Sequence, residues 1–278
     1  MVKKTAREVT EDKTSRIMNV VALWASFYRA NPQRFCKDYL NVNLKMFQQI
    51  LIYCMALCTN FCFIAARGLG KTFLCAIFCC WKAILYPGSL IVIASKTRNQ
   101  GSLVLKKIEQ ELVPRSPLLR SEIKDITINQ SVAKITFRND SVIEVVTAAD
   151  TARGGRASLL IIDEYRMVDK EVLDLVLKKF LNYIRHPGYM DNPKYAHLAE
   201  RNQQMYLSSA WFEQHWSWDL CKDYFVNMFD TTKNYYCFRF PYQMSIKENL
   251  LLKSQVEDEM TESTFSDIRF RMENEALF

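Results

Sequence analysis

The segment "FIAARGLGKTFLCAIF", residues 63–78, places a glycine-rich turn between two apolar runs. The residues before the turn are typical of a short buried strand, and those after it are typical of a helix. A strand, a glycine turn and a helix in this order point backbone N–H groups and the helix N-terminus at one spot, which suits a phosphate chain. The segment therefore predicts a phosphate-binding loop inside an α/β domain.

This loop departs from the usual spacing at one position. Gly70, Lys71 and Thr72 match the Gly-Lys-Ser/Thr ending of the motif, but Ala65 stands where its first glycine is expected. Lys71 is suited to contact the outer phosphates of a nucleotide, and the Thr72 hydroxyl is suited to ligate Mg²⁺. Arg67 adds a second cation within the loop. The incomplete match leaves open a working site, a dead site and a chance similarity.

A second element argues against chance. In "SLLIIDEY", residues 158–165, an apolar strand ends in Asp163 and Glu164. Ligands bind at the carboxyl ends of strands in open α/β sheets, so both acids are expected beside the loop. Asp163 is suited to hold Mg²⁺, and Glu164 is suited to orient and polarise an attacking water molecule.

Two arginines precede this strand in the segment "ADTARGGRAS", residues 149–158. Phosphoryl transfer requires positive charge at the γ-phosphate, which Arg153 or Arg156 is able to supply. A solvated surface loop with two basic residues is the alternative interpretation.

The remaining pattern indicates an α/β fold with a central, mostly parallel sheet flanked by helices. Strand and helix patterns alternate around the loop, as crossover connections require. Alternation at 125–148, with a turn at Asn139-Asp140, predicts an inserted antiparallel hairpin or meander. The acids after Ser245 are expected on the solvated face of a helical tail. The predicted helices include 14–30, 44–58 and 97–113, and the predicted strands 61–66, 89–95, 158–165, 203–211 and 234–242.

Composition narrows the class of protein. The 278 residues carry a net charge of +7, which is compatible with a nucleic-acid partner without requiring one. Nine cysteines lack any Cys-x-x-Cys pair and only three histidines occur, so the thiols are interpreted as buried apolar positions on helices rather than metal ligands. No secretory signal is evident, which favours a reducing cytosol. Polar residues interrupt the apolar run 46–66, which argues against a membrane span.

On these residues the chain resembles, over nearly its whole length, the ATPase domain of the large terminase subunit, the DNA-packaging motor of tailed double-stranded DNA bacteriophages. That family holds adenine with a Leu-x-Pro-aromatic-Gln segment. It reads Leu44 to Gln48 here, with Met46 in place of the proline. The resemblance implies a P-loop NTPase of the ASCE type in which Gln48, or alternatively Gln49, binds the base. It also implies that irregularity at Ala65 is tolerated.

Further roles follow from the resemblance. It implies that Arg153, with Arg156 as the second candidate, acts in trans on the site of a neighbouring subunit. It also implies that the segment 208–210 couples hydrolysis to DNA movement. The expected catalytic residues are Glu164, Lys71, Arg67, Arg153 and Arg156, the coupling residues Ser208, Ser209 and Ala210, and the Mg²⁺ ligands Thr72 and Asp163. The expected nucleotide-binding residues are Gln48, Gln49, Ala65, Ala66, Arg67, Gly68, Leu69, Gly70, Lys71 and Thr72.

The implied function is an ATP-hydrolysing motor that moves double-stranded DNA into a procapsid in the host cytoplasm, with ATP and Mg²⁺ as cofactors. The implied partners are DNA, the portal protein, the small terminase subunit and further copies of the chain. These copies would form a ring, pentameric when assembled, from a chain that is monomeric in isolation; no membrane partner is expected. The expected division is a helical segment at 1–43, an ATPase core at 44–243 and a lid or linker at 244–278. The family continues into a nuclease domain, and no nuclease activity is expected from this chain.

Two other classes are alternatives. A superfamily 2 helicase-like translocase shares the glutamine, loop and Asp-Glu elements, but it requires a second domain of the same kind, for which residues 211–278 are too few. A non-catalytic DNA-binding or assembly module with a degenerate nucleotide fold would account for Ala65. It would not account for the presence together of Lys71, Thr72, Asp163 and Glu164, since a dead site needs none of these four groups.

Overall fold

The computed structural model describes residues 6–149 and 154–278. Within them, eight strands form one sheet in the order β3-β4-β5-β2-β6-β7-β1-β8. The central strands are short apolar runs buried on both faces, as parallel strands covered by helices require. The strands are β1 (Asn60–Ala65), β2 (Leu90–Ser95), β3 (Ile123–Ile128), β4 (Ala133–Phe137), β5 (Val142–Thr147), β6 (Leu159–Asp163), β7 (Gln203–Ser208) and β8 (Tyr235–Phe240).

The sheet is parallel from β5 through β2, β6, β7 and β1 to β8. Strands β3, β4 and β5 form the expected antiparallel meander. Strand β7 lies between β1, which leads into the glycine loop, and β6, which ends in the acids, and this inserted strand is the arrangement of the ASCE class. Because the parallel strands share one direction, their carboxyl ends meet at one edge of the sheet.

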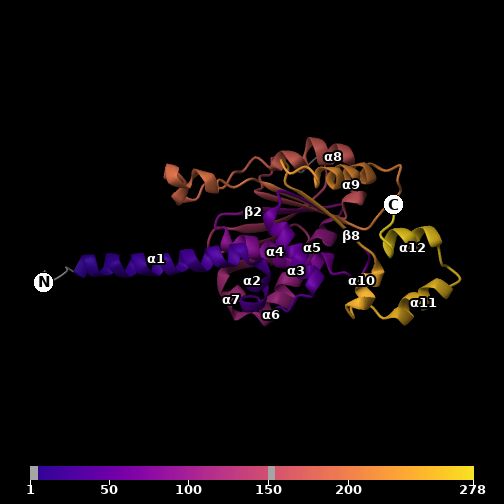
Figure 1. The fold of residues 1–278 in the computed structure, drawn as a ribbon, viewed down its shortest axis with the longest axis horizontal. Coiled ribbons are helices and arrows are strands. Elements are labelled where there is room, and N and C mark those ends of the chain that lie inside the picture. The colour runs from indigo at the N-terminus through magenta and orange to yellow at the C-terminus, as the bar shows by residue number, and fades with distance from the viewer. Residues whose placement is uncertain (1–5, 150–153) are drawn as a thin grey trace.

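Helices cover both faces of the sheet, with α2 to α7 on one side and α8 and α9 on the other (Figure 1). Each side has its own apolar core: Phe61 and Phe63 of β1 face the first, and Cys62 and Ile64 face the second, as the two-residue period of a strand requires. The helices are α1 (Ala6–Ala30), α2 (Pro32–Asp38), α3 (Met46–Leu57), α4 (Lys71–Leu85), α5 (Arg98–Lys107), α6 (Val113–Arg115), α7 (Pro117–Glu122), α8 (Lys170–Leu175), α9 (Trp216–Asn227), α10 (Tyr242–Lys247), α11 (Lys253–Thr261) and α12 (Asp267–Glu273), with a π-helical turn η1 (Ile108–Leu112) and 3-10 turns η3 (Tyr165–Met167), η4 (Leu177–Phe180), η5 (Gly188–Asp191) and η6 (Pro193–Leu198).

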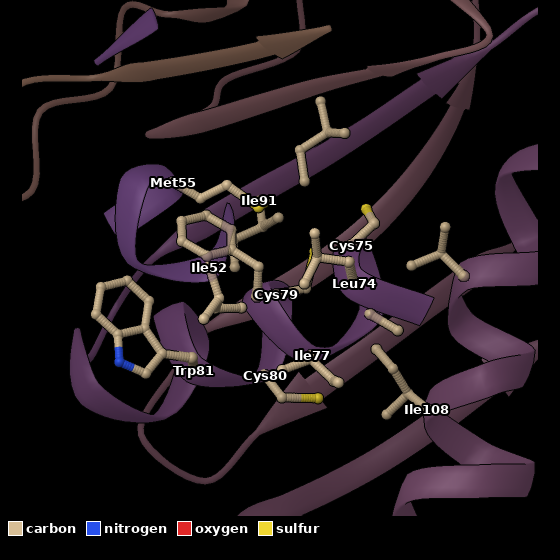
Figure 2. Close-up of a cluster of buried hydrophobic side chains, with 14 of the residues drawn as sticks. Ile52, Met55, Leu74, Cys75, Ile77, Cys79, Cys80, Trp81, Ile91 and Ile108 are labelled. Atoms are coloured by element: carbon tan, nitrogen blue, oxygen red, sulfur yellow. The ribbon is translucent and has the colours of Figure 1, made fainter. Parts of the chain in front are cut away.

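Helix α4, which follows the glycine loop, forms the centre of the larger core. All of its residues from Leu74 to Leu85 are buried, and a helix that is apolar on every side requires cover on every side. Figure 2 shows the buried cluster around α4, to which α3, β2 and η1 contribute Ile52, Met55, Ile91 and Ile108. This packing fixes the helix whose N-terminus carries the loop lysine.

Two parts of the chain lie outside these layers. In Figure 1, α1 extends away from the body as a single long helix, and its exposed apolar residues include Ile17, Val20 and Leu23. Helices α10 to α12 follow β8 at the opposite end of the molecule. Helix α12 buries Phe270 and Met272, so the tail packs in part against the body.

The apolar stretch 46–66 divides into α3 and β1. In residues 6–149 and 154–278, none of the helices has both the length and the apolar character that crossing a membrane requires. The rejection of a membrane span at 46–66 is thereby confirmed.

The expected helix at 97–113 is irregular near its end. Helix α5 stops at Lys107, and the π-helical turn η1 leads into α6, which contains Pro114. Proline has no N–H to donate and its ring clashes with the carbonyl four residues earlier. The hydrogen-bond pattern therefore changes before Pro114.

Substitution of Gly101 tests the close packing of α5 on the sheet. A Cβ on Gly101 would lie 2.5 Å from Val145 Cγ1 and 2.8 Å from Ser95 Oγ. Alanine gains about 1 kcal/mol in helix propensity, but overpacking costs about 1–3 kcal/mol, so Gly101→Ala is expected to lower the free energy of unfolding measured with urea. In a Val145→Ala background the same change should be less destabilising, because of the two close contacts only that with Ser95 Oγ then remains. Equal destabilisation in both backgrounds would contradict the packing argument.

Candidate active site

The glycine loop passes from β1 to α4 through two residues in the left-handed region. Gly68 has a φ of 81° and Gly70 a φ of 76°, a conformation that glycine adopts without strain. Ala65 is instead the last residue of β1 and pairs with Phe240 of β8. Because that position is part of the strand ladder, it needs no glycine, and the irregularity at Ala65 leaves the turn intact.

Lys71 begins α4 and brings its ammonium group to the edge where the strands end. Its Nζ donates a hydrogen bond to Ala65 O at 2.8 Å and lies 3.5 Å from Ser209 Oγ. The distance from Nζ to Glu164 Oε1 is 3.9 Å. Burial lowers the pKa of Lys71, and the charges of Glu164 and Asp163 oppose that shift. The loop lysine and the acid pair therefore form one electrostatic unit.

Asp163 ends β6 and is only 7% exposed. Burial, followed by repulsion from Glu164, raises the pKa of Asp163 to about 7, while Lys71 acts in the opposite sense. Thr72 is half-buried in the first turn of the adjoining helix α4. A carboxylate next to a second carboxylate, with a hydroxyl on the neighbouring helix, is an oxygen donor set of the type that Mg²⁺ prefers.

Glu164 follows in an uncommon backbone conformation. Its φ is 48° and its ψ is 52°, in the left-handed region that residues other than glycine rarely adopt. Ser208 Oγ donates a hydrogen bond to Glu164 Oε2 at 3.2 Å, and Arg166 Nε lies 3.3 Å from the same oxygen. Strained residues of this kind cluster at functional sites, and here the strained residue is the carboxylate expected to act on water.

Arg166 joins the site although the sequence analysis did not predict it. Its Nη2 lies 2.5 Å from Glu273 Oε1, its Nη1 donates to Ala210 O at 2.9 Å, and its guanidinium lies 4.8 Å from the centre of the Trp211 ring. With a side chain only 10% exposed, Arg166 connects Glu164, the end of β7 and the C-terminal helix. Its one sequence signal was its position two residues after Glu164.

Glu273 corrects the expectation that the acids of the tail lie on a solvated face. Its side chain is 19% exposed, and its Oε2 lies 3.3 Å from Arg67 Nε. Its carbonyl oxygen also accepts a hydrogen bond from Arg67 N at 3.1 Å. Burial alone would raise the pKa of Glu273, but Arg166 and then Arg67 hold it below its usual value. The C-terminal helix is therefore attached directly to the glycine loop.

The two candidate glutamines, Gln48 and Gln49, differ in the groups that their side chains contact. Gln48 Oε1 accepts a hydrogen bond from Lys45 N at 3.0 Å, and its Nε2 lies 3.5 Å from the position of a Cβ on Gly70. Gln49 instead donates to Leu44 O at 3.0 Å. A cavity of about 330 Å³ lies beside Gln48 and the loop glycines, and a cleft of about 1150 Å³ lies between the loop and the helices α11 and α12. Gln48 is thus the glutamine that adjoins the loop.

The remaining predicted residues differ in where they lie. Ala66 and Leu69 are buried residues of the loop itself. The segment 208–210 is buried at the end of β7, in contact with the charged residues of the site. Arg153 lies outside the described residues. Arg156 is exposed, and within the described part of the chain its side chain forms no hydrogen bond or ion pair.

Asp163 gives a pH-dependent prediction. Its pKa is about 7 in the folded chain against an ordinary value of 3.8, so its ionisation reduces stability as the pH rises through that interval. Asp163→Asn removes this charge at every pH. The free energy of unfolding of the variant minus that of the parent should therefore be more positive at about pH 8, where the parent carries the buried charge, than at about pH 5. The control Asp223→Asn, at an exposed position, should change the free energy of unfolding by less than about 0.5 kcal/mol. An equal effect of Asp163→Asn at both pH values would contradict the raised pKa.

Comparison with known proteins gives consistent matches. The family described as terminase large subunit, ATPase domain, matches residues 45–185. The fold is similar to the large terminase ATPase domain of Thermus phage P74-26, with a TM-score of 0.61 at 14% identity over 87% of this chain and 96% of that chain. No curated protein sequence gives a significant match.

Two longer proteins are similar in the same way. The HK97 bacteriophage large terminase has a TM-score of 0.60 at 15% identity, over 84% of this chain and 50% of that chain. The large terminase of a thermophilic bacteriophage, solved in complex with ADP, has a TM-score of 0.56 at 14% identity, over 84% of this chain and 53% of that chain. The chain therefore spans about half the length of these two proteins, and at such identities the likeness concerns the fold.

Proposed function

We propose, from the premise that this chain belongs to the family of terminase large-subunit ATPase domains, that it hydrolyses ATP to move double-stranded DNA into a viral procapsid. The observation that carries the proposal is the convergence of Lys71, Glu164 and Ser209 at one edge of the sheet, where Lys71 Nζ lies 3.9 Å from Glu164 Oε1 and 3.5 Å from Ser209 Oγ. Binding of phosphates requires a cation in the loop, and activation of water requires a carboxylate nearby. Lys71 and Glu164 supply these two groups at one place.

In this mechanism the loop N–H groups and Lys71 bind the phosphates of ATP. Glu164 accepts a hydrogen bond from the attacking water and orients it toward the γ-phosphorus. Gln48 lies beside the cavity that would hold the adenine. Thr72 and Asp163 would hold Mg²⁺, which when bound neutralises charge on the phosphate oxygens.

Coupling of hydrolysis to movement is assigned to the end of β7. Ser208 donates to Glu164, Ser209 contacts Lys71, and the carbonyl of Ala210 accepts from Arg166. A change in the charge held by Lys71 and Glu164 is therefore transmitted to β7 and, through Arg166, to α12. The ATPase core is assigned to 44–243, with 1–43 as an N-terminal helical segment and 244–278 as a lid or linker.

Double-stranded DNA, the portal protein and the small terminase subunit are the proposed partners, in a homo-oligomeric ring at the portal of the procapsid in the host cytoplasm. The test is ATP turnover by the chain, alone, with double-stranded DNA and with portal-bearing procapsids. Turnover that rises with DNA and procapsids supports a packaging motor. No turnover under any of these conditions rejects the enzyme and favours the non-catalytic module.

The ring also requires an arginine acting in trans, for which Arg153 is the first candidate and Arg156 the second. Mixed rings of Arg153→Ala and Glu164→Gln subunits should recover part of the activity, because some interfaces then combine an intact arginine with an intact glutamate. The measurement is ATP turnover against the mixing ratio in the assembled complex. No recovery at any ratio, either for Arg153→Ala or for Arg156→Ala in its place, would contradict a trans arginine in this segment.

A further inference from the structure

Three cysteine side chains from three separate elements meet on the face of the sheet that α9 covers. Cys62 lies on β1, Cys237 on β8 and Cys221 on α9, and their sulfur atoms lie within 4.8 Å of one another. Cys62 and Cys237 are direct partners in the parallel pairing of β1 with β8, so their side chains leave the same face of the sheet. Cys62 and Cys237 therefore lie on strands, whereas the sequence analysis interpreted the thiols as buried positions on helices.

We propose that these three thiols form a binding site for a thiophilic divalent cation, with Zn²⁺ as its occupant. Tetrahedral zinc binds cysteine sulfur at about 2.3 Å, which places two such sulfur atoms about 3.8 Å apart. The distance from Cys221 Sγ to Cys237 Sγ is 3.9 Å. Three thiolates leave a fourth coordination position, which a water molecule fills in zinc sites with three protein ligands.

The surroundings of the three thiols suit a soft cation. Met228 Sδ accepts a hydrogen bond from Cys237 N at 3.5 Å, so a thioether lies beside the cluster. Thiolate and thioether sulfur select zinc and similar soft ions over magnesium or calcium. Cys62 is fully buried and Cys221 is 9% exposed, whereas Cys237 is half-buried. The three thiols therefore offer a bound ion a position shielded from solvent.

The place of the cluster in the fold gives the site a structural role. Cys62 lies three residues before Ala65, whose carbonyl accepts the hydrogen bond from Lys71 Nζ. A bound cation would join β1, the strand that leads into the glycine loop, to β8 and α9, because each of these elements supplies one ligand. The inference does not depend on ATP hydrolysis, and its readouts are metal content, absorbance and thermal stability.

The test uses the folded 278-residue chain, reduced and freed of metal with a chelator, and titrated with Cd²⁺ as the probe. Cadmium thiolates absorb in the ultraviolet through sulfur-to-metal charge transfer, so the expected result is a band that saturates at one Cd²⁺ per chain. Cd²⁺ added to the zinc-loaded chain should displace Zn²⁺ as the band appears, because thiolates prefer the softer ion. X-ray absorption of the zinc-loaded chain should report three sulfur ligands. Zn²⁺ at a concentration well above its dissociation constant should raise Tm by several degrees.

Variants locate the site within the chain. Cys221→Ala and Cys237→Ala should lose the band and the rise in Tm, whereas Cys79→Ala, which removes a fully buried thiol elsewhere, should keep both. Cys221→Ser serves as a second variant of similar size, and circular dichroism verifies that each chain is folded. A folded, reduced chain with no band overturns the proposal. So does a band that survives both Cys221→Ala and Cys237→Ala, or one that Cys79→Ala reduces equally.

Discussion

Glu164→Gln is expected to lower ATP turnover by about 10²- to 10⁴-fold, the range that general acid–base catalysis contributes. The amide keeps the size of the side chain and its contact with Ser208, which lies 3.2 Å from Glu164 Oε2, but it is far less able to accept a proton from water. ATP binding should persist, because Lys71 and the loop N–H groups remain in place. The measurements are steady-state phosphate release and equilibrium binding of a fluorescent ATP analogue.

Glu171→Gln is the matched control for this change. Glu171 is exposed in the first turn of α8, and its substitution removes the same charge away from the loop. Its turnover should remain within about twofold of the parent, since surface substitutions act weakly. Turnover by Glu164→Gln that also stays within twofold of the parent would remove Glu164 from the catalytic role, even if ATP were still bound.

Arg166→Gln is expected to lower the free energy of unfolding by about 3 kcal/mol, because it removes the buried partner of Glu273 and leaves this carboxylate paired only with the exposed Arg67. Arg166 is 10% exposed and its partner Glu273 is 19% exposed, so solvent screens the pair poorly. The loss also frees Glu164 from its contact at 3.3 Å with Arg166 Nε, and ATP turnover should fall with stability. Urea denaturation and phosphate release are the two measurements.

Two further variants make this prediction specific. Arg271→Gln breaks an exposed ion pair on α12, the helix that carries Glu273; the side chains of Arg271 and Asp267 are 61% and 72% exposed. It should lower the free energy of unfolding by less than about 0.5 kcal/mol. The double variant Arg166→Gln with Glu273→Gln should be more stable than Arg166→Gln alone, because position 273 then carries no charge that has lost its buried partner. Equal losses in Arg166→Gln and Arg271→Gln would show that the buried pair has no special role.

The site residues that directly follow an apolar run in the sequence could be predicted from the sequence alone. The glycine loop, Lys71 and the Asp163–Glu164 pair each follow an apolar run, and the shared direction of parallel strands brings such ends together. The strands, the meander and the fold class follow from the same alternation of residues. The choice between Gln48 and Gln49 was not predictable, because neighbouring positions on a helix differ only in the direction of their side chains.

The sequence by itself thus determined the strands, the glycine loop and the position of the two acids, because each depends on residues close together in the chain. The tertiary structure alone decided that Arg166 contacts Glu164, that Glu273 contacts Arg67 across a separation of 206 residues, and that three thiols distant in the sequence meet between β1, β8 and α9. Such contacts depend on how strands are ordered and how the tail returns to the sheet. The local periodicity of the sequence indicates neither the order of the strands nor the path of the tail.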